Sequence, residues 1–220
     1  MSHLETELHL LKEGLIEMTR LVKIQLFKGR DALLHFDRDL AREIIVNENR
    51  INALELKIDR DCENIFALFN PVAVDLRFVL AALKINANLE RIGDNAEGIA
   101  RYVMEVDRPF DEKIIKGYCV EEMCNTATSM LDNTLEALLQ EDTKLARQVF
   151  LKDDRLDEIN KDCTKTTLRL LKENPDNALH YLSIMSIIRK LERVGDQSKN
   201  IAEEIIFYIE AKVLKHAEEK

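Results

Sequence analysis

The chain has 220 residues with 41 acidic and 32 basic side chains, which gives a formal net charge of −9. Apolar residues make up 46% of it, a share typical of a globular chain and not of a disordered one. The acidic balance argues against nucleic acid or an anionic membrane as the main partner, because phosphate groups are bound by concentrated lysine and arginine. With only 6 Gly and 3 Pro, the chain also lacks the turn residues that an all-β fold needs.

Apolar segments and cysteines bear on the cellular compartment. The longest run without Asp, Glu, Lys or Arg covers 12 residues, 177–188, whereas a membrane-spanning helix needs about 20. The N-terminus has glutamates among its leucines and no apolar signal-peptide segment. We therefore predict a cytoplasmic protein that reaches a membrane only through partners. No zinc-finger spacing occurs among its cysteines, and each lies on or beside an apolar helical stripe: Cys62, Cys119, Cys124 and Cys163.

Apolar residues recur at spacings of three and four along the first half of the chain, which predicts helices. The first predicted helix begins near Leu4 and ends at Gly29. A very long second helix fills residues 30–70, where Gly and Pro are absent. Asn70-Pro71 then has the form of an N-cap followed by proline at the first helical position. The third helix that it starts is expected to stop before Pro109.

The second half repeats these signals. A fourth predicted helix runs from Val120 to Leu138 and breaks near Glu141-Asp142. The fifth follows over residues 145–170, and Asn174-Pro175 starts the sixth.

The repetition is also visible in the letters of the sequence. LERIGDNAEGIA at 89–100 aligns with LERVGDQSKNIA at 191–202, with seven of twelve positions identical. Upstream, ENRINALE at 48–55 aligns with DDRLDEIN at 153–160 at an offset of 105, close to the offset of 102 between the two motifs. We therefore predict an all-α fold of six long helices, forming two tandem, internally duplicated three-helix bundles over residues 1–107 and 108–220.

Each repeated motif places two carboxylates four residues apart on one helix face, where like charges repel by about 0.2–0.5 kcal/mol unless they are neutralised. A glycine precedes the aspartate in both copies. Because a helical Gly costs about 1 kcal/mol relative to Ala, its repetition indicates that another helix or a ligand comes close. The second helix of each bundle adds a four-spaced pair beside its apolar stripe. The candidate metal ligands are Glu48, Asn52, Glu90 and Asp94 in the first bundle, and Asp153, Asp157, Glu192 and Asp196 in the second.

Oxygen-only clusters of this kind suit hard cations. The second cluster has four carboxylates, whereas Asn52 replaces one of them in the first, so we expect the first site to be the weaker. The simplest alternative is that the acids form a solvated helix face without metal. The sequence does not identify the metal, and Fe, Mn, Mg and Zn all remain open.

The tandem LERIGD-type motifs, the PVAVDLR segment at 71–77 and the two-fold repeat together resemble the PhoU family of bacterial phosphate-signalling regulators, over essentially the whole chain. The resemblance implies two three-helix bundles that carry surface metal clusters at the eight positions above. It also implies a non-enzymatic regulator that restrains phosphate uptake and the phosphate-starvation response. Its expected partners are the ATPase of the phosphate ABC transporter and the sensor histidine kinase. Two departures from a symmetric pattern, Gly98 opposite Asn200 and Lys199 opposite Glu97, predict unequal metal occupancy of the two halves.

Two other functions stay open on the sequence. One is a metal-dependent phosphoesterase or oxidase that uses the carboxylate clusters, and the other is a metal-free helical scaffold. The histidines form no Glu-x-x-His pair of the ferritin type, and the chain has no Walker-type phosphate loop. Long amphipathic helices often leave a face for self-association, so we expect a homodimer.

Overall fold

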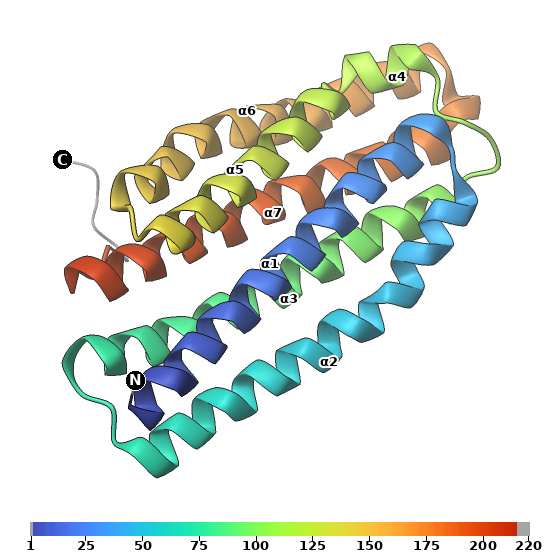
Figure 1. Cartoon of the computed structure of the whole chain (residues 1–220). Coiled ribbons are helices and arrows are strands. Elements are labelled where there is room, and N and C mark those ends of the chain that lie inside the picture. Colours follow the sequence, from blue (N-terminus) through green and yellow to red (C-terminus); the bar gives the residue numbers. More distant parts are fainter. Residues whose placement is uncertain (1, 215–220) are drawn as a thin grey trace.

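The computed structural model describes residues 2–214, and all regular structure in that range is helical (Figure 1). The predicted all-α chain with six long helices is confirmed, with one short helix in addition. The helices are α1 (His3–His35), α2 (Arg38–Phe69), α3 (Ala73–Glu105), the short α4 (Glu112–Gly117), α5 (Val120–Gln140), α6 (Thr143–Glu173) and α7 (Ala178–Glu210), with a 3₁₀ turn (Pro175–Asn177) before α7.

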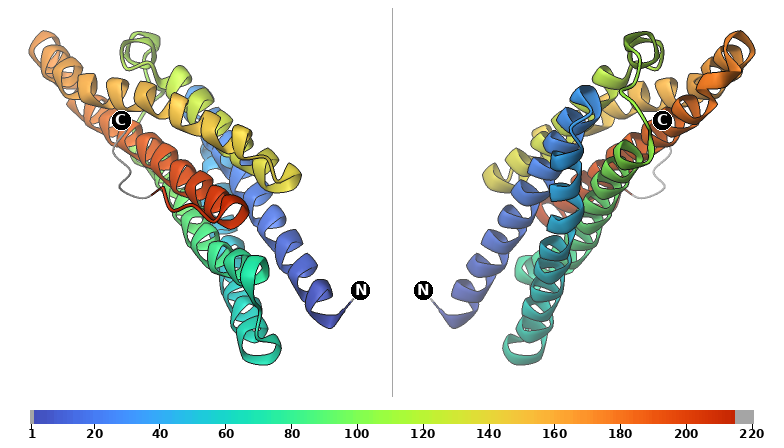
Figure 2. Two further views of the ribbon diagram at one scale, coloured as in Figure 1. Left: turned by 90° about the vertical axis from the view of Figure 1, so that its left-hand side faces the viewer. Right: turned by 90° about the vertical axis from the view of Figure 1, so that its right-hand side faces the viewer.

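The long helices form two three-helix bundles, α1–α3 and α5–α7, which pack against each other mainly along α3 and α7 (Figures 1 and 2). These two helices run antiparallel. Lys84, in the first half of α3, donates a hydrogen bond to Glu204 near the end of α7. Gly98, later in α3, lies against Lys190 in the first half of α7. Because the repeated motifs lie on α3 and α7, both copies come to the middle of the molecule.

Each long helix turns an apolar stripe into its bundle. Leu15, Ile58 and Ile92 are fully buried or nearly so in the first bundle, as are Leu156 and Val194 in the second. Burial of large aliphatic side chains stabilises by about 1.5–3 kcal/mol each, which favours this packing over isolated helices. Among residues 2–214, no helix is both long and apolar enough to cross a membrane.

The first helix does not end at Gly29, so that prediction is wrong. Gly29 is buried inside α1, and the next turn buries Ala32 and Leu33 as well. Burial of this turn outweighs the helix cost of one Gly, which is about 1 kcal/mol. The chain instead reverses at Phe36, which adopts the left-handed conformation with φ 52°, directly before the N-cap Asp37.

Asn70 was expected to start the third helix, and this prediction is also wrong. Asn70 ends α2 in the left-handed conformation, with φ 46°, and α3 begins only at Ala73. Asparagine tolerates this conformation better than most residues, so it suits a helix end as well as a start. In the second bundle the expectation holds, since the Asn174 side chain accepts the Asp176 N–H and Pro175 opens the 3₁₀ turn before α7.

The other predicted breaks are confirmed. Helix α3 ends at Glu105, ahead of Pro109, and the chain turns at Glu141 between α5 and α6. Residues 106–119, which include the short α4, connect the two bundles. The proposed division at residues 107 and 108 falls within this connection and, as a domain boundary, stays a prediction. All four cysteines are free thiols, and Cys62, Cys124 and Cys163 are buried in helices.

Replacing Asp37 by Ala is expected to lower the free energy of unfolding by about 1 kcal/mol, because its carboxylate accepts the N–H groups of Asp39 and Leu40 at the start of α2. Urea unfolding followed by circular dichroism measures this loss. Asp39→Ala is the matched control: the Asp39 side chain is exposed and pairs with its own helix neighbour Arg42, so its removal should cost less than about 0.5 kcal/mol. Equal losses in both variants would contradict the capping role.

Candidate metal centres

The two repeated glycines lie where α3 and α7 approach the second helix of their own bundle. A Cβ atom at Gly93 would lie 2.9 Å from Cδ1 of Ile51 on α2. A Cβ atom at Gly195 would lie 2.4 Å from Cδ1 of Leu156 on α6. Real Cβ atoms do not approach this closely, so only glycine permits the observed packing. The predicted close approach is confirmed, and the neighbour is a helix.

This packing brings the first set of acids together across α2 and α3. Glu48 is 6% exposed, and neither of its carboxylate oxygens has a hydrogen-bond partner among residues 2–214. Burial raises the pKa of Glu48 to about 7, and the nearby negative charges of Asp94, Glu97, Glu90 and Glu55 act in the same direction. Isolated charge is very costly to bury, so this carboxylate is either protonated or in need of a cation.

The members of the first cluster differ in exposure. Glu90 and Asp94 are half-buried and exposed respectively, and burial together with neighbouring acids raises the pKa of each. Asn52 is exposed on α2, one turn beyond Glu48. Glu97 joins the cluster from α3, as its effect on the pKa of Glu48 shows. The comparison of the two motifs singled out position 97, but only as a difference between the copies.

The second set of acids meets in the same way across α6 and α7. Burial, then Asp196 and Asp157, raises the pKa of Glu192. Burial, then Asp153 and Asp157, raises the pKa of Asp196. The four predicted residues are therefore near one another. Unlike Glu48, the buried Asp153 has a cationic partner, because the Lys199 ammonium donates to its Oδ2 at 2.7 Å.

Both clusters present the right donor type for a hard cation, but neither is a finished coordination sphere. No three His, Cys, Asp or Glu side chains between residues 2 and 214 are arranged so that they could hold a metal ion. Like charges separate when no cation draws them together, which is the expected state of the metal-free protein. The orphaned carboxylate of Glu48 fits a cation at the first cluster, whereas Lys199 already neutralises part of the second.

A groove of about 620 Å³ lies between α3 and α7. Asp94 of the first cluster and Asp196 of the second both line it. The basic side chains Arg91 and Arg193, which follow the motif glutamates, also line the groove. Arg91 lowers the pKa of Glu90, and Arg193 lowers the pKa of Glu192 and of Asp196, although burial and the neighbouring acids outweigh both effects. The acid clusters therefore border on a surface that carries both signs of charge.

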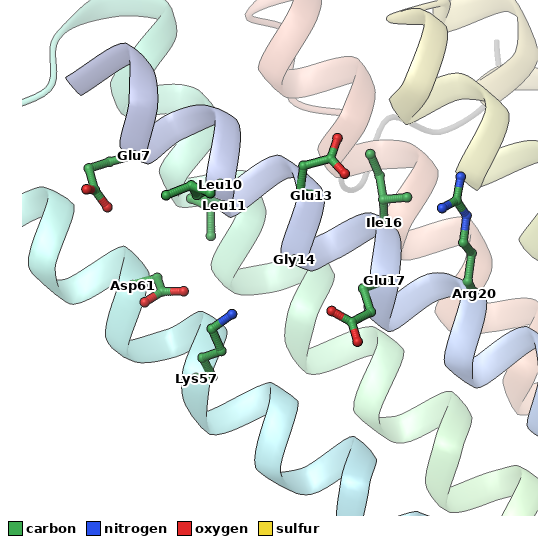
Figure 3. A pocket seen from close by; sticks show the side chains of 10 residues that line it. All are labelled: Glu7, Leu10, Leu11, Glu13, Gly14, Ile16, Glu17, Arg20, Lys57 and Asp61. Atoms are coloured by element: carbon green, nitrogen blue, oxygen red, sulfur yellow. The ribbon is translucent and has the colours of Figure 1, made fainter. Parts of the chain in front are cut away.

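Another hollow, of about 400 Å³, lies between α1 and α2 (Figure 3). Leu10 and Leu11 form its apolar part, and Lys57 and Asp61 come from α2. None of the eight candidate ligands lines it.

The PVAVDLR segment has a structural role at the start of α3. The Arg77 guanidinium donates through Nε to the backbone oxygen of Tyr208 at 3.1 Å, which ties the start of α3 to the end of α7. Phe78 packs against the Tyr208 ring in a tilted arrangement, with 5.1 Å between ring centroids and an interplanar angle of 57°. These contacts across the two bundles explain Arg77 without a ligand, and they were not predictable from the sequence.

The fold and the paired acids define a class of protein: duplicated three-helix bundles with one cluster of acidic side chains in each half. A family model described as the PhoU domain matches residues 15–103 and again residues 120–205. The chain therefore belongs to the PhoU family, and the predicted two-fold repeat is confirmed.

Individual relatives agree with this assignment. The chain is 32% identical over 216 residues to a phosphate-specific transport system accessory protein PhoU homolog of Burkholderia, covering 98% of this chain and 92% of the relative. The crystal structure of PhoU from Pseudomonas aeruginosa superposes with a TM-score of 0.87 at 30% identity, over 94% of this chain and 99% of that one. The phosphate transport system regulatory protein PhoU from Streptococcus pneumoniae gives 0.86 at 27% identity, over 96% and 99%.

The chain is thus an accessory and regulatory protein of phosphate transport, from a family that is not enzymatic. This assignment does not support the alternative of a phosphoesterase or oxidase that uses the carboxylates.

Proposed function

We propose that this protein is a metal-binding adaptor that restrains phosphate uptake and the phosphate-starvation response. It acts by stoichiometric binding and not by turnover. Its partners are the ATPase of the phosphate ABC transporter and the phosphate-sensing histidine kinase, which it meets on the cytoplasmic side of the membrane. The family assignment supports the regulatory role, and the two acidic clusters support the binding of metal.

One observation carries the metal proposal: the carboxylate of Glu48 is buried with both oxygens unpartnered. In the first bundle Glu48, Glu90 and Asp94 would hold the ion, with Asn52 at the edge. In the second bundle the ligands would be Asp153, Asp157, Glu192 and Asp196. A hard divalent or trivalent cation (Mn, Mg, Fe or Zn) supplies charge neutralisation there, and so joins α2 to α3 or α6 to α7.

We further propose that the protein acts as a homodimer. Several large apolar side chains stay exposed on its helices, among them Phe27, Leu56 and Leu151, and exposed apolar surface favours association. Sedimentation equilibrium of the full chain measures the mass directly, and a monomer at all concentrations would contradict this part of the proposal.

The test of metal binding is elemental analysis of the purified full chain and of two cluster variants, each checked for helicity by circular dichroism. One variant combines Glu48→Gln, Glu90→Gln and Asp94→Asn, and the other Asp153→Asn, Glu192→Gln and Asp196→Asn. We expect the wild type to retain Mn, Mg, Fe or Zn after gel filtration. The amounts of metal lost in the two variants should add up to the amount that the wild type retains. A wild type that holds no metal under saturating conditions would leave the acids as a solvated face.

The regulatory role is tested in cells that lack the endogenous protein and carry a reporter of the phosphate-starvation response. The wild-type chain is expected to silence the reporter in high phosphate and to co-purify with the transporter ATPase and the kinase. The cluster variants, if folded, should lose silencing by at least about tenfold. Silencing by a variant that binds no metal would separate the adaptor role from metal, and failure of the wild type to silence would contradict the adaptor role itself.

A further inference from the structure

The two bundles each bury one acid at the same place on their second helix. Glu48 on α2 and Asp153 on α6 are equivalent in the repeat, and their exposed fractions are 6% and 5%. Their partners differ. Both oxygens of Glu48 lack a hydrogen bond, whereas Oδ2 of Asp153 accepts a hydrogen bond from Lys199 at 2.7 Å. One buried charge is therefore uncompensated and the other is paired.

The difference arises at one position of the repeated motif, four residues after the glycine. In α7 this position is Lys199, whose pKa is raised by its hydrogen bond to Asp153 and also by the nearby charges of Asp196 and Asp157. In α3 it is Glu97, which adds a negative charge beside Glu48 and Asp94. The same helix position thus supplies a cation to one cluster and a further acid to the other.

We infer that Lys199 is the built-in cation of the second cluster, and that a divalent metal ion therefore binds preferentially at the first cluster through Glu48, Asp94 and Glu97. This inference rests on the proposed metal binding and assigns it to one half of the molecule. It reverses the order expected from Asn52. That residue is exposed and stands at the edge of the first cluster, so its missing charge matters less than the charge at position 97 or 199.

The physical reason is competition between cations for one set of carboxylates. A metal ion that binds Asp153 in the second cluster must displace the charge-assisted hydrogen bond from Lys199, whereas at Glu48 in the first cluster it meets two buried oxygens with no hydrogen-bond partner among residues 2–214. Glu97 is paired with Arg101 of its own helix, but that pair leaves the carboxylate of Glu48 without a cation. Neighbouring acids also strengthen cation binding at the first cluster, where the charge of Lys190 offsets part of this effect at Asp94. At the second cluster the ammonium of Lys199 bonds directly to Asp153 and weakens the binding of another cation.

The test exchanges the two side chains. Binding of Mn²⁺ to the metal-stripped full chain is measured by equilibrium dialysis with elemental analysis, for the wild type, Glu97→Lys, Lys199→Glu and the double exchange. We expect one tight site in the wild type, a loss of at least about tenfold in its affinity in Glu97→Lys, and a second site of comparable affinity in Lys199→Glu. The double exchange should again bind one ion, which Asp153→Asn removes and Glu48→Gln does not.

A second experiment measures the thermal stability of the metal-free protein. In the presence of a chelator, Glu97→Lys should raise the thermal midpoint by about 2–4 °C, because it places a cation beside Glu48, and Lys199→Gln should lower it by a similar amount. A wild type that fills both clusters equally, or loses its ion on Asp153→Asn alone, would overturn the inference and leave the proposed metal binding intact. A wild type that binds no Mn²⁺ would instead remove the proposed metal binding, and with it the assignment to one cluster.

Discussion

Replacing Glu48 by Gln is expected to stabilise the metal-free protein by about 1–3 kcal/mol at pH 8. The carboxylate of Glu48 is buried, its oxygens have no hydrogen-bond partner, and Asp94 and Glu97 add like charge. The glutamine keeps the shape of the side chain and removes the charge, which is the costly part of this burial. Urea unfolding in the presence of a chelator measures the gain.

The same change should flatten the dependence of stability on pH. The pKa of Glu48 is raised from 4.5 to about 7, so the folded protein retains a proton that the unfolded chain releases between these values. The free energy of unfolding of the metal-free wild type therefore falls as the pH rises from about 4.5 to 7. The raised pKa values of Glu90 and Asp94 act in the same direction and remain in the variant. A variant with an unchanged slope, or without added stability at pH 8, would contradict the buried-charge interpretation.

The matched control is Asp153→Asn, which changes the equivalent residue of the second bundle. Here the carboxylate is paired with Lys199, so its loss should destabilise the protein by about 1–2 kcal/mol instead. Opposite signs at two equivalent positions are the expected outcome. Equal signs would mean that the two clusters have the same electrostatic character in solution.

Replacing Gly195 by Val is expected to destabilise the protein by about 3 kcal/mol or more. A Cβ atom would come within 2.4 Å of Cδ1 of Leu156, which is itself fully buried in the core. Valine adds two further methyl groups to that space, and overpacking of a core costs about 1–3 kcal/mol even for smaller changes. The higher helix propensity of Val offsets only a few tenths of a kcal/mol of this cost. Thermal and urea unfolding both report the loss.

Gly117→Val serves as the comparison, because a Cβ atom at Gly117 meets no atom within 4 Å. That substitution should change the free energy of unfolding by less than about 0.5 kcal/mol. Gly93→Val is expected to resemble Gly195→Val, since its Cβ atom would lie 2.9 Å from Ile51. A mild effect at Gly195 would show that α6 and α7 can separate without cost, contrary to their close packing.

The sequence by itself determines the helices of this protein, its duplication and the positions of its acidic residues. The spacing of apolar residues predicts the long helices and the duplicated motif predicts two bundles, because helix periodicity and repetition are local properties of the chain. The acids of the two clusters were also visible, since four-spaced residues share a helix face whatever packs against it. The ends at Gly29 and Asn70 were misplaced because their conformation depends on burial that local preferences do not report.

Only the tertiary structure decided how the charges are balanced. The sequence contains Lys199 and Glu97 at equivalent positions, but it does not say that one contacts a buried acid and the other crowds one. Likewise Arg77 finds the backbone of Tyr208 only after α3 and α7 have packed antiparallel. Electrostatic energies depend on separation and burial across different helices, and these distances exist only once the helices have packed together.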